Sequence, residues 1–220
     1  MDYKERIDEL LNEFKGGRFI YGPGCLGEVG DAVSGLGQKA VLIRDGFPGI
    51  EAFADDLKES LHRAEVSLIA ELVEVIRPNA PVEDMDRVKE SLSSLKPDVV
   101  ISLGGGSTID AVKSAIVLEV LGGDIEEYFG VNQVSDALKE GGKTLTPHVA
   151  IQTAASSAAH LTKYSNITNL ETNQKKLIVD EAVVPTLPVF DYSITYHTPP
   201  GLTLDGALDG MSHCLEVYFG

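Results

Sequence analysis

The sequence predicts an α/β fold with a parallel sheet. Apolar segments of strand length alternate with amphipathic segments of helical length, and Gly or Pro residues separate most of them. Residues 98–121 place a continuous apolar strand, three consecutive glycines and a helical segment in immediate succession. Strands that alternate with helices are typical of parallel sheets, because each helix carries the chain back to the end where the next strand begins.

The elements follow in order from the N-terminus. Residues 1–15 are charged and amphipathic and predict a surface helix. Residues 123–150 are less regular, and 153–185 carries few strong signals apart from KKLIVDEAVVP. From Thr203 onward, apolar residues recur at helical spacing and predict a last helix. The other expected helices are 28–36, 53–66, 82–95, the segment after the three glycines and a short one at 124–130; the expected strands are 18–24, 39–46, 70–76, 98–103 and one inside 143–153.

Composition excludes several classes of protein. The chain has 220 residues, of which 43% are hydrophobic, so it can bury a sizeable core. It lacks an apolar run long enough for a transmembrane helix, and its charged start lacks the apolar region of a signal peptide, so we expect a cytoplasmic protein with no membrane partner. The 34 acidic residues outnumber the 18 basic ones, for a net charge of -16, so nucleic acid is not an expected partner.

Two glycine loops are candidates for binding a phosphate. The first, Gly22-Pro-Gly24-Cys-Leu-Gly27, matches the G-x-G-x-x-G pattern, follows a short strand and precedes Asp45 by roughly the spacing of a dinucleotide-binding fingerprint. The alternative is a tight turn in which glycines adopt positive φ angles. The proline and the short strand favour the turn.

The second loop, Gly104-Gly105-Gly106-Ser107, follows an apolar strand and opens a helix. Three glycines allow the backbone to approach a ligand, and Ser107 is expected to cap the helix, whose N–H groups then point at an anion. A plain turn between a strand and a helix needs only one glycine, so three in a row favour diphosphate binding. This arrangement predicts a Rossmann-like dinucleotide-binding domain.

Asp45 ends its strand beside the expected crevice. A carboxylate there can accept hydrogen bonds from the hydroxyls of the adenosine ribose and would repel a 2′-phosphate, which favours NAD over NADP. A turn formed by Asp45 and Gly46 is the alternative explanation of the same residues.

An ordered set of motifs resembles one known family. GGGSTIDAVK resembles the GGGSxxDxxK motif of the iron-containing (group III) alcohol dehydrogenases. GPGCLGEVG is similar to the family's opening glycine turn, RPNAP to its PNP segment, and IQTAASSAAHLT to its IPTTAGTGSEVT-like loop. KKLIVDEAVVPTLPVFDYSITYHTPP matches the lysine-strand-proline segment, and LDGMSHCLE the D-A-x-x-H-A-x-E metal helix. The resemblance covers the whole chain but only a little over half of the family's usual length.

The resemblance implies a fold, an activity and a set of site residues. It implies an α/β dinucleotide-binding domain over 1–198 and, over 199–220, the first helix of an all-helical metal-binding domain. It also implies NAD-dependent oxidoreduction of a small alcohol or aldehyde at Fe²⁺ (or Zn²⁺), in a homo-oligomer. The implied metal ligands are Asp209 and His213, and the implied cofactor residues are Asp45, Asn79, Gly104, Gly105, Gly106, Ser107, Asp110, Thr153, Thr162 and Lys175.

The chain also departs from the family pattern. Its AASSAAH loop has Ser157 in place of threonine and His160 in place of glutamate, and His160 is a candidate proton relay near the nicotinamide. The family's two further histidine ligands come from the helical domain, so no catalytic residue is assigned here. Two hypotheses follow: the cofactor-binding half of an alcohol dehydrogenase, or a non-catalytic dinucleotide-binding module or inactive remnant. Retention of the Asp209 and His213 pair argues against a third, a zinc-dependent polyol dehydrogenase.

Overall fold

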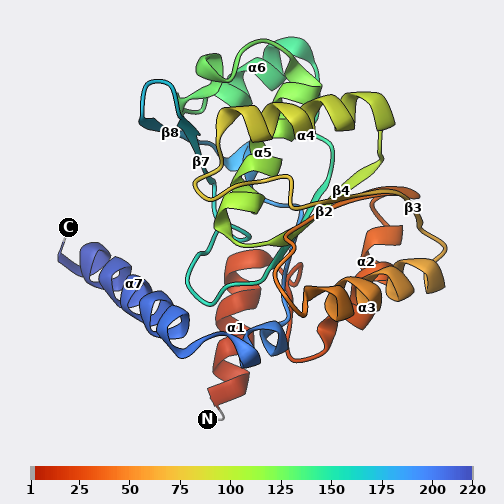
Figure 1. The fold of residues 1–220 in the computed structure, drawn as a ribbon, viewed down its shortest axis with the longest axis vertical. Coiled ribbons are helices and arrows are strands. Elements are labelled where there is room, and N and C mark those ends of the chain that lie inside the picture. The colour runs from red at the N-terminus through yellow and green to blue at the C-terminus, as the bar shows by residue number, and fades with distance from the viewer. Residues whose placement is uncertain (1–2, 220) are drawn as a thin grey trace.

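The computed structural model describes residues 3–219 and contains the expected parallel sheet (Figure 1). Within that range the main sheet has six strands in the order β1-β9-β6-β4-β2-β3, and every neighbouring pair in it is parallel. Its strands are β1 (Ile20–Tyr21), β2 (Lys39–Arg44), β3 (Ser67–Val73), β4 (Val99–Gly104), β6 (His148–Gln152) and β9 (Leu187–Phe190).

Helices cover both faces of this sheet, as its apolar central strands require. All residues of β4 and β6 are buried, so neither of their faces meets water. In Figure 1, α2 and α3 lie on one side of the sheet and α4, α5 and α6 on the other. The helices are α1 (Tyr3–Lys15), α2 (Val29–Ser34), α3 (Ile50–Arg63), α4 (Val82–Leu95), α5 (Gly106–Leu121), α6 (Gln133–Gly141) and α7 (Pro200–Phe219).

Two hydrophobic clusters fill the layers between helices and sheet. One joins Leu42 and Ile101 of the sheet to Leu57 of α3, and the other joins Val41 to Met85 of α4 and Val112 of α5. Alternate residues of one strand therefore serve opposite cores. Since α5 is buried along most of its length, it is the central helix of the second layer.

A small second sheet lies beside α5. Among the described residues it has the order β5-β8-β7, with β5 at Gly130–Val131, β7 at Tyr164–Asn169 and β8 at Gln174–Val179. The antiparallel hairpin of β7 and β8 packs on α5, and Ile167 and Ile178 join its core cluster. β8 contains the apolar signal expected at KKLIV, whereas β7 is mixed in polarity and carries no clear strand pattern.

Helix α7 extends away from the rest of the chain (Figure 1). Gly206 is its one buried residue within the described range, and its backbone passes close to the Ser156 side chain. The apolar residues Leu208, Met211 and Leu215 are more than half exposed. The helix expected from Thr203 onward is confirmed, and the domain boundary at 198/199 stays a prediction. No helix within 3–219 is both long and apolar enough to cross a membrane.

Candidate functional site

The candidate site lies where the direction of strand order reverses. From β2 the chain goes outward to β3 and then returns past β2 to β4, so the ends of β2 and β4 flank the reversal. In sheets of this type, ligands bind outside the carboxyl ends of the strands at such a point. Asp45 follows β2, Glu74 follows β3, and the glycine loop ends β4. Together they line a cavity of about 470 Å³.

The three glycines of the loop have different roles. A Cβ on Gly104 would lie 2.7 Å from Thr108 Cβ and 2.9 Å from Asp45 Oδ1, and one on Gly106 would lie 2.7 Å from Ser157 Oγ. Any larger residue at these two positions would therefore clash with neighbouring protein atoms, so both positions require glycine. A Cβ on Gly105 would have no atom within 4 Å, so the backbone there faces open space. Gly105 is the position at which a ligand can approach the loop most closely.

Ser107 does not cap α5, contrary to the expectation. The N-cap is Gly105 and α5 begins at Gly106, so Ser107 already lies in the first helical turn. Its hydroxyl instead accepts a hydrogen bond from the Asn79 N–H at 2.9 Å. Asn79 has a left-handed backbone, with φ at 68°, so this bond holds a tight turn against the start of α5.

Asp45 fixes the loop from the neighbouring strand. One of its oxygens accepts a hydrogen bond from the Gly105 N–H at 3.0 Å, and the other accepts one from the Thr108 hydroxyl. A carboxylate has about four lone-pair sites, so these two bonds leave capacity for a ligand. The sequence motif could not show this contact, because Asp45 and Thr108 lie far apart in the chain.

The charges around the cavity are mainly negative. Glu74 lines it together with Asp45, and the Arg77 side chain also reaches it. The Arg77 guanidinium, however, donates hydrogen bonds to Asp84 at 2.8 to 3.1 Å. Although burial raises the pKa of Asp84, Arg77 and Arg87 outweigh it and hold that pKa below its usual range. Arg77 is therefore committed to an ion pair.

The far side of the loop is held by polar residues of α5. Asp110 accepts hydrogen bonds from the backbone and side chain of Asn166, and Lys113 donates to the carbonyls of Thr162 and Tyr164 at 2.9 and 2.7 Å. Burial raises the pKa of Asp110, which the nearby Lys113 ammonium only partly offsets. Burial also lowers the pKa of Lys113 to about 8. These residues attach α5 to the segment that enters β7.

Thr153 contacts the glycine loop directly, whereas Lys175 is related to it only through its neighbour Thr168. The Thr153 N–H donates to the Gly104 carbonyl at 3.1 Å, and the Thr168 hydroxyl donates to the Asn79 carbonyl at 2.7 Å. Lys175 is exposed on β8, directly opposite Thr168. Of the predicted cofactor residues, Gly104, Thr153 and Asp110 are buried, and Thr162 contacts the buried Lys113 amine through its carbonyl. Their role in cofactor binding stays a prediction.

The first glycine loop is a turn, as the alternative explanation predicts. Gly22 and Gly24 have positive φ angles of 140° and 73°. The N–H groups of Gly24 and Leu26 donate to the Asp191 carboxylate at 3.0 and 3.4 Å. An aspartate thus already occupies the position that an anion would take, which the sequence could not reveal because Asp191 lies far along the chain.

His160 is a buried residue. It is 4% exposed, and its ring lies 5.9 Å from the rings of both Phe19 and Phe190. Burial, with smaller contributions from the charges of Lys113 and Lys15, lowers the pKa of His160 to about 4. A proton relay by a titrating ring is therefore disfavoured near neutral pH, and the relay stays a prediction.

The candidate metal ligands face each other on α7. Asp209 Oδ1 lies 3.5 Å from His213 Nε2, and Glu216 Oε2 lies 3.3 Å from His213 Nδ1. Asp209 and His213 are more than half exposed. Carboxylate and imidazole suit a divalent metal, yet residues 3–219 contain no group of three or more side chains placed to hold one.

Comparison with known proteins decides the family. The family model described as iron-containing alcohol dehydrogenase matches residues 16–192. This chain belongs to the iron-containing alcohol dehydrogenase family. The match includes both glycine loops and ends before α7, so the Asp209 and His213 pair lies outside it.

Several members of the family are similar over most of this chain. Alcohol dehydrogenase 4 of Saccharomyces cerevisiae is 32% identical over 200 residues, which cover 90% of this chain and 50% of the yeast protein. NAD-dependent methanol dehydrogenase of Bacillus methanolicus is 29% identical, with the same coverage. The crystal structure of a 1,3-propanediol oxidoreductase shares the fold, with a TM-score of 0.81 at 24% identity over 90% of this chain and 50% of that one. The chain thus spans about half the length of these relatives.

Two residues of the site have only a weak signal in the sequence. Glu74 follows β3 as Asp45 follows β2, so its place beside the crevice could be found once the strand order was known. Thr108 lies inside the glycine motif but has no distinguishing feature apart from its contact with Asp45.

Proposed function

We propose that this chain supplies the nucleotide-binding half of an NAD-dependent, metal-dependent alcohol dehydrogenase, which transfers a hydride between a small alcohol or aldehyde and the nicotinamide. The observation that carries the proposal is the open backbone at Gly105, where α5 begins at the point of strand reversal. The partial positive charge of a helix N-terminus attracts a diphosphate locally. This local attraction operates despite the net charge of -16.

In this proposal different residues of the crevice contact different parts of the cofactor. Gly104, Gly105, Gly106 and Ser107 wrap the diphosphate. Asp45 positions that loop and accepts hydrogen bonds from the ribose, and Asp110 supports the loop from below. Contacts to the adenine and ribose side come from Asn79, Thr153, Thr162 and Lys175.

The charges of the crevice support NAD as the preferred cofactor. Asp45 and Glu74 both line the cavity and would repel the 2′-phosphate of NADP. Arg77 is the basic residue among the described residues that line the cavity, and its ion pair with Asp84 leaves it poorly placed to compensate. We therefore expect NADH to bind more tightly than NADPH.

Asp209 and His213 are the residues that would hold the metal. A bound metal would act as a Lewis acid toward the alcohol oxygen, and NAD would accept the hydride. Catalytic metals generally have three or more protein ligands, so these two need further donors. That shortage favours a second candidate function, a dinucleotide-binding module without catalysis. A homo-oligomer stays a prediction.

Fluorescence titration of the 220-residue chain with NADH, with NADPH as the control, tests the cofactor assignment. We expect saturable binding of NADH and weaker binding of NADPH. An alcohol-oxidation assay with added Fe²⁺ then separates the two candidates. Binding without turnover supports the non-catalytic module for this chain, whereas metal-dependent turnover supports the dehydrogenase. No binding of either nucleotide would overturn both.

A further inference from the structure

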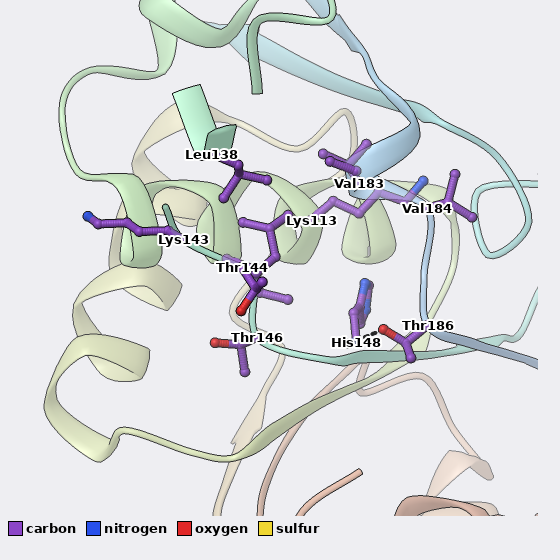
Figure 2. Close-up of a pocket in the computed structure, with 12 residues that line it drawn as sticks. Lys113, Leu138, Lys143, Thr144, Thr146, His148, Val183, Val184 and Thr186 are labelled. Carbon is purple, nitrogen blue, oxygen red and sulfur yellow. Dashed lines mark hydrogen bonds between the residues drawn. The ribbon is translucent and has the colours of Figure 1, made fainter. Parts of the chain in front are cut away.

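A second cavity lies at the opposite end of the sheet from the glycine loop (Figure 2). It has a volume of about 270 Å³ and opens beside His148, the first residue of β6, and Thr186, which directly precedes β9. The glycine loop instead follows the last residue of β4, which is parallel to β6. The two cavities therefore sit at opposite ends of the parallel strands, and this one belongs to no part of the proposed cofactor site.

The walls of this cavity are mainly apolar and carry no acidic side chain within the described chain. Ile116, Leu138 and Val183 provide apolar surface, and threonines 144, 146 and 186 provide hydroxyl groups. Lys113 and Lys143 are the two charged residues of the lining, in a chain with almost twice as many acidic as basic residues. The lining residues themselves therefore carry positive charge, although the Lys113 ammonium lies 3.8 Å from the Asp110 carboxylate and the Thr146 hydroxyl donates to Glu119.

His148 gives the cavity a buried, unsatisfied polar group. It is 5% exposed, and its Nδ1 atom has no hydrogen-bond partner among the described residues. Figure 2 shows the ring directed from β6 into the cavity, toward the side chain of Lys113. A buried polar atom without a partner costs about 1 to 3 kcal/mol, so such an atom aimed into a cavity favours a ligand that satisfies it.

The neighbouring serine determines which ring nitrogen carries the proton. Nε2 of His148 lies 2.8 Å from the Ser102 hydroxyl, which is fully buried. The hydrogen bonds of the described residues give that hydroxyl no other acceptor for its single proton, which favours its donation to Nε2. Nε2 then accepts, and the ring proton lies on Nδ1. His148 therefore presents an N–H donor to the cavity.

We propose that this cavity reversibly binds a small organic carboxylate, whose oxygen accepts a hydrogen bond from His148 Nδ1 and whose apolar body contacts Ile116, Leu138 and Val183. An N–H donor among lining residues that include two lysines and no carboxylate favours a negatively charged acceptor. The volume lies just below the range of about 300 to 1,000 Å³ that holds drug-sized ligands, so the ligand is a short one. Lys113 contributes charge, since its amine already donates to two backbone carbonyls.

Calorimetric titration with sodium hexanoate tests the proposal, with hexanol and hexanamide as uncharged ligands of equal chain length. We expect saturable binding of hexanoate and at least tenfold weaker binding of both controls. Hexanoate should not compete with NADH, so failure of the cofactor assignment would leave this result unchanged. Absence of saturable hexanoate binding, or equal binding of the uncharged ligands, would overturn the proposal.

Matched variants locate the site. The double variant Ser102→Ala and His148→Phe removes the donor without leaving a buried partner unsatisfied, and we expect at least a tenfold loss of hexanoate affinity. Thr144→Trp narrows the exposed rim and should cause a similar loss without disturbing the core. His62→Phe, on the exposed face of α3, should bind as the unchanged chain does. Unchanged affinity in Thr144→Trp would place the ligand elsewhere.

Nitrogen NMR of the histidine rings gives an independent measurement that needs no variant to fold. We expect His148 to be neutral with its proton on Nδ1, and the Nδ1 signal to shift on addition of hexanoate. A proton on Nε2, or a signal that hexanoate leaves unmoved, would contradict the proposed hydrogen bond even if hexanoate binds.

Discussion

Replacing Gly105 with alanine separates folding from cofactor binding. A Cβ at this position would have no protein atom within 4 Å, and the φ angle of −77° suits alanine. Alanine reduces the entropy of the unfolded chain, which stabilises by about 0.4 to 1 kcal/mol, but it is a poorer N-cap than glycine, which costs an amount of similar size. The free energy of unfolding should therefore change by less than about 1 kcal/mol.

The same methyl group would occupy the space where the proposed diphosphate meets the backbone. Loss of that close approach should weaken NADH binding at least tenfold, which corresponds to about 1.4 kcal/mol. Fluorescence titration with NADH and urea denaturation of the same Gly105→Ala preparation measure the two quantities.

Gly104→Ala is the matched control for this experiment. Its Cβ would lie 2.7 Å from Thr108 Cβ and 2.9 Å from Asp45 Oδ1, so overpacking should lower the free energy of unfolding by about 1 to 3 kcal/mol. We therefore expect Gly105→Ala to weaken NADH binding with little change in stability, and Gly104→Ala to lower stability. If Gly105→Ala binds NADH as tightly as the unchanged chain, the diphosphate does not lie on this loop and the reasoning fails.

Three further predictions concern other residues. Asp45→Asn removes a negative charge from the crevice, so fluorescence titration should show a rise of about tenfold in the ratio of NADPH to NADH affinity. An unchanged ratio would mean that Asp45 does not select the cofactor. Asp191→Ala leaves the N–H groups of Gly24 and Leu26 without their acceptor. Urea denaturation should show a loss of about 2 kcal/mol in the free energy of unfolding, while NADH affinity stays constant. A loss of NADH affinity without a loss of stability would mean that the first glycine loop binds the cofactor. His160 has a pKa of about 4 in the fold, below its ordinary value of 6.5, so the stability it contributes is complete above pH 6.5 and is lost as the pH falls toward 4. Denaturation at pH 7.5 and 5 should show a shallower loss for His160→Phe than for the unchanged chain, and equal losses would contradict the assigned pKa.

The fold was largely predictable because its signals are local. The buried strands β2 and β4 are continuous apolar runs, and the amphipathic helix expected at 82–95 coincides with α4. Strand β7 was not predictable, since its residues do not alternate in polarity and its buried positions, Ser165 and Ile167, are set by packing against α5. The segment expected as a strand at 70–76 begins earlier, at Ser67, because α3 ends at Arg63 and the chain turns at Glu65 with a positive φ angle.

The sequence by itself determined the glycine loop, its strand and helix, the carboxylate at Asp45 and the family to which these motifs belong. Each of these depends on residues that are neighbours in the chain or on a fixed spacing. Only the tertiary structure decided what the polar groups contact, since hydrogen bonds join residues far apart in sequence. The Ser107 hydroxyl accepts a hydrogen bond from the Asn79 N–H instead of capping the helix, and the Asp191 carboxylate accepts one from the first glycine loop. The tertiary structure also buried His160 between aromatic rings, where desolvation keeps the imidazole uncharged.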